Sequence, residues 1–205
     1  NVSSLSLGTA EDTTPAGQPS QQAVGSVDHY RLEASRLGQE IWDAAIPNNK
    51  GRPEWLGMDL GVDGESFHFG LIGNSLYSGA SGIALLFARL AQICTGDFAN
   101  PWAERAWCCF EGLAELAERN SNDQWFRLVR DMPYGIIGSG GILLTLELLK
   151  RAGMSKAGSL AEHLVAQLRP ARLLEDEAVD LIGGVAGLIG PLLMIGSPRS
   201  HALAL

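Results

Sequence analysis

The sequence predicts an all-α fold, an α/α toroid of which this chain forms an incomplete arc of about three repeats. A G-x-x-G pair occurs at residues 79–82, 138–141 and 184–187, and each pair runs directly into an apolar stretch. The leading glycines are 59 and 46 residues apart, a spacing typical of repeated supersecondary units. Glycines three apart lie on one face of a helix's first turn and let another backbone approach closely. We therefore expect a ring of helix pairs.

The composition fits this fold and excludes one class of partner. The chain has 205 residues, of which 46% are hydrophobic and 7% aromatic, and it contains 25 glycines. This is enough for one domain, or a piece of a larger one, with a core built on small-residue helix packing. The formal net charge is −8. Because no basic groove is visible, we expect no nucleic-acid partner.

The N-terminal third is expected to hold a linker, one helix and a glycine-rich segment. Residues 1–26 are polar and rich in Ser, Thr, Gln, Gly and Pro, which favours a flexible linker or tail. An amphipathic helix follows from Val27. The glycine-rich residues 48–74 predict an ordered loop or a short hairpin, anchored by Trp55 and Leu56.

In the rest of the chain, amphipathic helices with a wet face alternate with apolar, glycine-led helices. The expected helices are 80–95, 101–119 after Asn100-Pro101, one from near Gly141 to Gly153, one that Pro170 ends, and one from near Gly187. This alternation is typical of a toroid, in which inner helices line a ring and outer helices cover it.

Two further features bear on the compartment. The uncharged stretch at residues 181–198 is broken by glycines and Pro191 and is short for a membrane span, so we expect a buried helix and no transmembrane segment. Cys94, Cys108 and Cys109 form no C-x-x-C motif and no Cys-His pair, which favours reduced thiols and no metal site in this chain. With no signal peptide visible, the expected location is cytoplasmic.

Five segments, in this order, resemble the cyclase domain of type II (LanM-type) lanthipeptide synthetases. They are residues 55–57 (WLG), 76–87 (LYSGASGIALLF), 95–97 (TGD), 134–141 (YGIIGSGG) and 180–187 (DLIGGVAG). The similarity covers roughly residues 27–195. The resemblance thus identifies residues 27–205 as the N-terminal portion of a LanC-like cyclase domain.

The resemblance implies a lanthionine synthetase. In that family an N-terminal dehydratase removes water from Ser and Thr of a ribosomal precursor peptide, and the LanC-like toroid adds peptide Cys thiols to the dehydrated residues, giving thioether rings. It also implies a zinc ion, held late in the domain by two Cys and one His, that lowers the pKa of the thiol. No cysteine of this chain matches those ligand motifs. We therefore expect this fragment to be inactive alone, with the zinc present only in the complete domain.

Asp180 is the candidate catalytic residue. The family has an acidic residue just before the third glycine motif, and Asp180 matches that position. Four residues before each leading glycine, the repeats offer Ser75, Tyr134 and Asp180, of which only the last is a carboxylate. Asp also commonly caps a helix N-terminus, so both roles stay open and can coexist.

Two alternatives from other classes also stay open. One is a non-catalytic helical-repeat module that binds a peptide on its concave face. The other is a glycoside-processing toroid, which needs paired carboxylates at the ring mouth, whereas Asp180 stands alone before the third inner helix. A continuing reading frame with a Cys and a later Cys-His pair would favour the cyclase, and its absence would favour the binding module.

Overall fold

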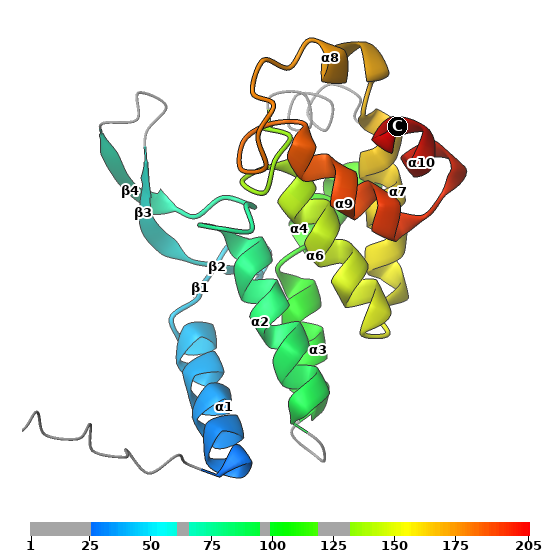
Figure 1. Cartoon of the computed structure of the whole chain (residues 1–205). Helices are drawn as coiled ribbons and strands as arrows, with labels where there is room; N and C mark the ends of the chain where they lie inside the picture. Colours follow the sequence, from blue (N-terminus) through cyan, green and yellow to red (C-terminus); the bar gives the residue numbers. More distant parts are fainter. Residues whose placement is uncertain (1–25, 61–65, 95–98, 119–131) are drawn as a thin grey trace, which may run out of the picture.

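The structure is a computed structural model and describes residues 26–60, 66–94, 99–118 and 132–205. Most of these residues are helical, which confirms the predicted all-α class, and Figure 1 shows a β-hairpin projecting from the group of helices. The predicted linker lies outside the described residues except for Ser26. Its Oγ accepts a hydrogen bond from the His29 N–H and so caps α1 (Val27–Asp43). The predicted helix end at residues 95–97 also lies outside them.

Three inner helices follow one another in space as they do along the chain. They are α2 (Ala80–Ile93), α6 (Ser139–Arg151) and α9 (Ala186–Ile195), and each begins inside its own glycine motif. α6 contacts both α2 and α9, and the three can be followed from green to orange in Figure 1. The glycine-led repeat of the sequence is therefore a structural repeat, as an arc of an α/α toroid requires.

Each inner helix is covered by the helix that follows it. α3 (Ala99–Cys108) lies on α2, α7 (Ser155–Gln167) on α6 and α10 (Pro198–Ala204) on α9, while α8 (Pro170–Leu174) follows α7. The prediction of one continuous helix over residues 101–119 is wrong, because the chain turns at Cys109 and Phe110 before α4 (Glu111–Glu118). The turn buries Phe110 and lets α4 contact α7 while α3 stays on α2.

The core lies between the inner and outer helices as one apolar cluster. α6 contributes four side chains with no exposed surface, Ile142, Leu143, Leu146 and Leu149. Ala161 and Leu164 of α7 and the adjoining Leu168 are also buried. Gly153 follows α6 with a φ of 101°, a left-handed conformation that favours glycine, so its predicted role in ending the helix is confirmed.

Close backbone contacts explain the glycine motifs. A Cβ atom placed on Gly140 would lie 2.6 Å from the Gly187 carbonyl oxygen, and one placed on Gly187 would lie 2.6 Å from the Gly135 Cα. Neither distance is compatible with a side chain at these positions. The first turns of α6 and α9 therefore approach each other in a way that only glycine permits.

Two antiparallel hairpins connect α1 to α2. Of the two structures predicted for this segment, an ordered loop or a short hairpin, the hairpin is confirmed. β1 (Ile46–Pro47) pairs with β2 (Pro53–Glu54), and β3 (Leu56–Leu60) pairs with β4 (Phe67–Leu71). Trp55 is buried between the hairpins and its Nε1 donates a 2.7 Å hydrogen bond to the Ile41 carbonyl. Leu56 is exposed, so its predicted anchoring role is wrong, because successive strand residues point to opposite faces.

The uncharged stretch at residues 181–198 contains α9 and ends at Pro198, the first residue of α10. Leu188 and Leu192 are buried, whereas Ile189 and Leu193 are 45% and 50% exposed. The expected buried helix is thus buried on one face only. Across the described ranges, no helix is both long and apolar enough to cross a membrane.

Candidate functional site

The loops that lead into α6 and α9 are joined by backbone hydrogen bonds. The Gly135 N–H donates to the Gly183 carbonyl and the Ile137 N–H donates to the Ile182 carbonyl, both at 3.1 Å. A Cβ atom on Gly135 would lie 2.1 Å from the Ile182 oxygen, so the pairing needs glycine there. This pairing fixes the segment that carries Asp180 against the preceding repeat.

Asp180 closes the turn that follows it. Its Oδ1 accepts hydrogen bonds of 2.6 Å from the Ile182 N–H and 2.7 Å from the Gly183 N–H. The hydrogen bond from Gly183, followed by that from Ile182, holds the pKa of this carboxyl below its ordinary value. The side chain is exposed, so at neutral pH the site presents an ionised carboxylate in a fixed orientation.

The equivalent position in the first repeat has the same local role. Ser75 Oγ accepts a 2.9 Å hydrogen bond from the Ser78 N–H, three residues on, as Asp180 does from Gly183. In the second repeat Tyr134 is half-buried, and burial raises the pKa of its hydroxyl. Asp180 therefore holds a turn in the loop that precedes α9. It does not cap the helix, because α9 begins at Ala186 with Val185 as its N-cap residue and has no side-chain cap hydrogen bond. The catalytic role of Asp180 stays a prediction.

Sequence reasoning missed the second carboxylate of this segment. Asp176 Oδ2 accepts a 2.7 Å hydrogen bond from the Val185 N–H at the start of α9. The two aspartates thus hold the same segment from its two ends. The signal was present in the sequence as a second Asp four residues before Asp180.

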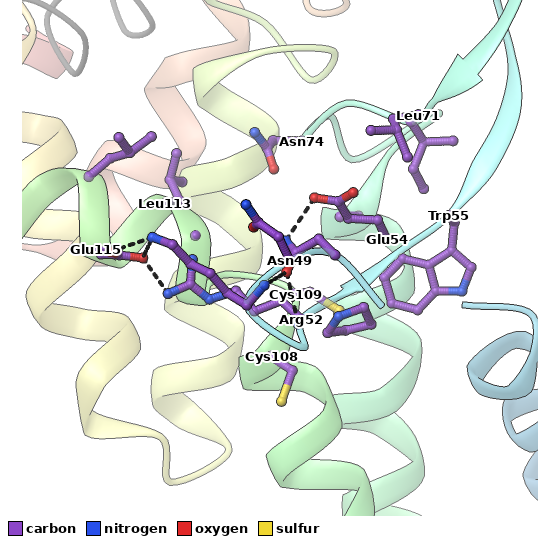
Figure 2. A pocket seen from close by; sticks show the side chains of 17 residues that line it. Asn49, Arg52, Glu54, Trp55, Leu71, Asn74, Cys108, Cys109, Leu113 and Glu115 are labelled. Atoms are coloured by element: carbon purple, nitrogen blue, oxygen red, sulfur yellow. Dashed lines mark hydrogen bonds and ion pairs between the residues drawn. The ribbon is translucent and has the colours of Figure 1, made fainter. Parts of the chain in front are cut away.

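A cavity of about 450 Å³ lies elsewhere, between the first hairpin and α4, and Figure 2 shows its lining. The Lys50 Nζ lies 2.6 Å from the Glu115 Oε1, and Arg52 forms an ion pair with the same carboxylate. The Asn48 Nδ2 donates a 2.9 Å hydrogen bond to the Glu54 Oε1. Because these charges are satisfied by the protein's own side chains, the cluster serves to join the hairpin to α4.

The vicinal cysteines also line this cavity, and they are free. Burial raises the pKa of the Cys109 thiol to about 12 and raises that of Cys108. Cys109 Sγ donates a 3.5 Å hydrogen bond to the Arg105 carbonyl. A thiol with a raised pKa stays protonated at neutral pH and is a poor nucleophile and metal ligand.

The residues that the structure describes do not fit the zinc ion that the resemblance implies. No group of three or more His, Cys, Asp or Glu among them could hold a metal ion, and zinc sites use three or four such ligands.

A family model described as lanthionine synthetase C-like protein matches residues 71–200, more than half of the chain. The matched range contains α2, α6, α9, all three glycine motifs and Asp180. No curated protein matches the chain.

Proposed function

The chain belongs to the lanthionine synthetase C-like family, and from this premise we propose that it is part of a LanM-type lanthionine synthetase acting on a ribosomal precursor peptide. The reaction adds the thiol of a peptide Cys to the Cβ atom of a dehydrated Ser or Thr. A C–S bond forms, the Cα=Cβ double bond becomes single, and Cα takes up a proton to replace the one that the thiol loses. The product is a thioether ring.

The observation that carries the proposal is the placement of Asp180 in the loop that leads into the third inner helix. Two backbone N–H groups fix its Oδ1, and the carboxylate is exposed. In an α/α toroid the N-terminal ends of the inner helices gather at one mouth of the ring. A peptide bound there would meet this carboxylate, which can accept a hydrogen bond or a proton during thiol addition.

The proposal extends to parts beyond the described residues. α9 leaves Ile189 and Leu193 about half exposed, which is the state of an inner helix whose next neighbour is not in place. Further repeats would cover this face and supply the zinc ligands, since the described residues do not fit zinc. A preceding dehydratase domain and a cytoplasmic location complete the proposal and rest on the resemblance. On this proposal the 205 residues alone hold no zinc and form no rings.

The test is Asp180→Asn in the complete enzyme, with Asp176→Asn as its matched control. Both aspartates accept hydrogen bonds from backbone N–H groups in one segment, and the side-chain oxygen of Asn can accept such hydrogen bonds as well. A positioned acid or base contributes about 10²–10⁴-fold to a proton transfer, so Asp180→Asn should slow ring formation by at least about tenfold. Asp176→Asn should leave ring formation near the wild-type rate, and dehydration should be unchanged in both variants.

Thiol alkylation followed by mass spectrometry counts the uncyclised cysteines of the product, and circular dichroism checks the fold. Wild-type ring formation by Asp180→Asn would limit the role of Asp180 to holding the turn before α9. Equal losses in the two variants would place the effect in the structure of the loop. A wild-type protein that binds the dehydrated peptide but forms no ring would contradict the cyclase function and favour the peptide-binding module.

A further inference from the structure

The β3–β4 hairpin has one wholly apolar face. Directly opposed residues of antiparallel strands share a face, and side chains alternate between faces along each strand. The register pairs Leu56 with Leu71 and Met58 with Phe69. Phe67 lies two residues before Phe69 and therefore shares its face. We call these five side chains the apolar face of the hairpin.

The opposite face of the hairpin carries small and polar residues. Trp55 directly precedes β3 and Ile72 directly follows β4, so both belong to this face. Trp55 is buried and Ile72 packs against the core. Farther out, this face has Gly57, Gly70 and the exposed His68, and a Cβ atom on Gly70 would meet nothing within 4 Å. The core therefore contacts only the base of the hairpin, and the large exposed apolar side chains lie on the other face.

The apolar face is exposed along its whole length. The exposed fractions are 47% for Leu56, 66% for Met58, 66% for Phe67, 73% for Phe69 and 60% for Leu71. Figure 1 shows the two strands extending beyond the helices. With aromatic side chains of about 150–250 Å² each, the five residues expose on the order of 500 Å² of apolar surface. Contiguous apolar patches of this size on soluble proteins mark interaction sites.

We infer that this face is the contact between two copies of the chain, packed face to face about a two-fold axis. Two such faces together would remove roughly 1,000 Å² from water, which reaches the lower limit of about 1,000 Å² for a specific interface. A two-fold contact needs a surface that complements itself. The paired strands meet this need, because each strand presents large apolar side chains at alternate positions on the same face.

Charge favours a second copy over a lipid surface. The apolar face carries no charged residue, so self-association brings no like charges together even though the net charge of the chain is −8. Segments that bind membrane surfaces combine apolar residues with Lys and Arg, and neither β3 nor β4 contains either. The inference stands apart from the proposed enzymatic function, because it uses neither Asp180 nor the family match.

The test is sedimentation equilibrium of the 205-residue chain with single lysine substitutions. Phe69→Lys places a charge in the apolar face, and His68→Lys places the same charge one residue away on the opposite face. Leu193→Lys places a charge on the exposed side of α9. Met58→Lys places a charge in the apolar face from β3, whereas Phe69→Lys does so from β4. We expect a wild-type dimer with a dissociation constant on the order of micromolar, as for interfaces at the low end of size. Phe69→Lys and Met58→Lys should weaken it by at least about tenfold, and the other two variants should leave it unchanged.

Each remaining outcome contradicts the inference. A wild-type chain that is monomeric throughout this concentration range has no such contact, and binding of that monomer to neutral phosphatidylcholine vesicles would assign the face to lipid. Equal effects of Phe69→Lys and His68→Lys would show that charge alone matters. Loss of the dimer in Leu193→Lys alone would place the contact on α9. Circular dichroism confirms that the variants, all at exposed sites, keep the helical fold.

Discussion

Two of the three glycine-led helices, α6 and α9, begin alike but differ in how far they are buried. Both start inside a G-x-x-G motif, and their leading loops are joined by backbone hydrogen bonds. α6 contacts an inner helix before it and another after it, and its Leu146 has no exposed surface. α9 contacts α6, and its Leu193 remains half exposed. The glycine motif thus determines how an inner helix starts, whereas its neighbours determine how strongly it is held.

A buried carboxylate ties the far ends of the same two helices together. Glu147 of α6 is buried and forms 3.0 Å ion pairs with Lys150 and Arg151. The Arg151 Nη2 also donates a 3.3 Å hydrogen bond to the Met194 carbonyl near the end of α9. The last turn of a helix leaves carbonyl groups without partners, and a cation there is favourable. α6 therefore supports α9 at both ends.

The largest contrast between the two helices is expected from deleting leucine side chains. Leu146→Ala in α6 should lower the free energy of unfolding by about 2–5 kcal/mol, because it leaves a cavity in a closed core. Leu193→Ala in α9 should change it by less than about 0.5 kcal/mol, because the side chain lies at the surface. Urea denaturation followed by circular dichroism measures both. Similar losses in the two variants would show that α9 is as tightly packed as α6.

A smaller contrast is expected from adding a methyl group to a glycine of each helix. Gly140→Ala in α6 forces a Cβ atom against the Gly187 and Tyr134 carbonyl oxygens and should destabilise the protein by about 1–3 kcal/mol. Gly190→Ala in α9 meets nothing within 4 Å apart from its chain neighbours. Alanine favours the helix, but the ring of the following Pro191 disfavours a helical residue with a Cβ atom before it, so the net change should be less than about 0.5 kcal/mol. The same urea titration decides, and a stabilising Gly140→Ala would contradict the role given to the motif.

Much of the helical repeat could be predicted from the sequence, because local signals determine it. The glycine motifs mark the start of α2, α6 and α9, and Gly153 and Pro170 mark ends that the structure confirms. Apolar residues also alternate with a period of two in the sequence of the second hairpin. This alternation is a weaker signal, because short segments rich in glycine are also typical of loops.

The rest depends on contacts between distant residues. The turn at Cys109 and Phe110 contains no glycine or proline, and it separates α3, which contacts α2, from α4, which contacts α7. The ion pair of Arg52 with Glu115 joins residues 63 positions apart. For Asp180, the sequence indicated both a helix cap and a catalytic carboxylate. The structure shows hydrogen bonds that close a turn before α9 instead of a helix cap, and the catalytic role awaits the kinetic test.

Native-state hydrogen exchange of the backbone amides tests most directly the claim that neighbours, rather than the glycine motif, stabilise each inner helix. Amides of α6 should exchange only through global unfolding, because the helix is enclosed by α2, α7 and α9. Amides of α9 should exchange faster by at least about tenfold, through local opening of the helix that has an exposed face. Equal protection of α6 and α9, or greater protection of α9, would contradict the account.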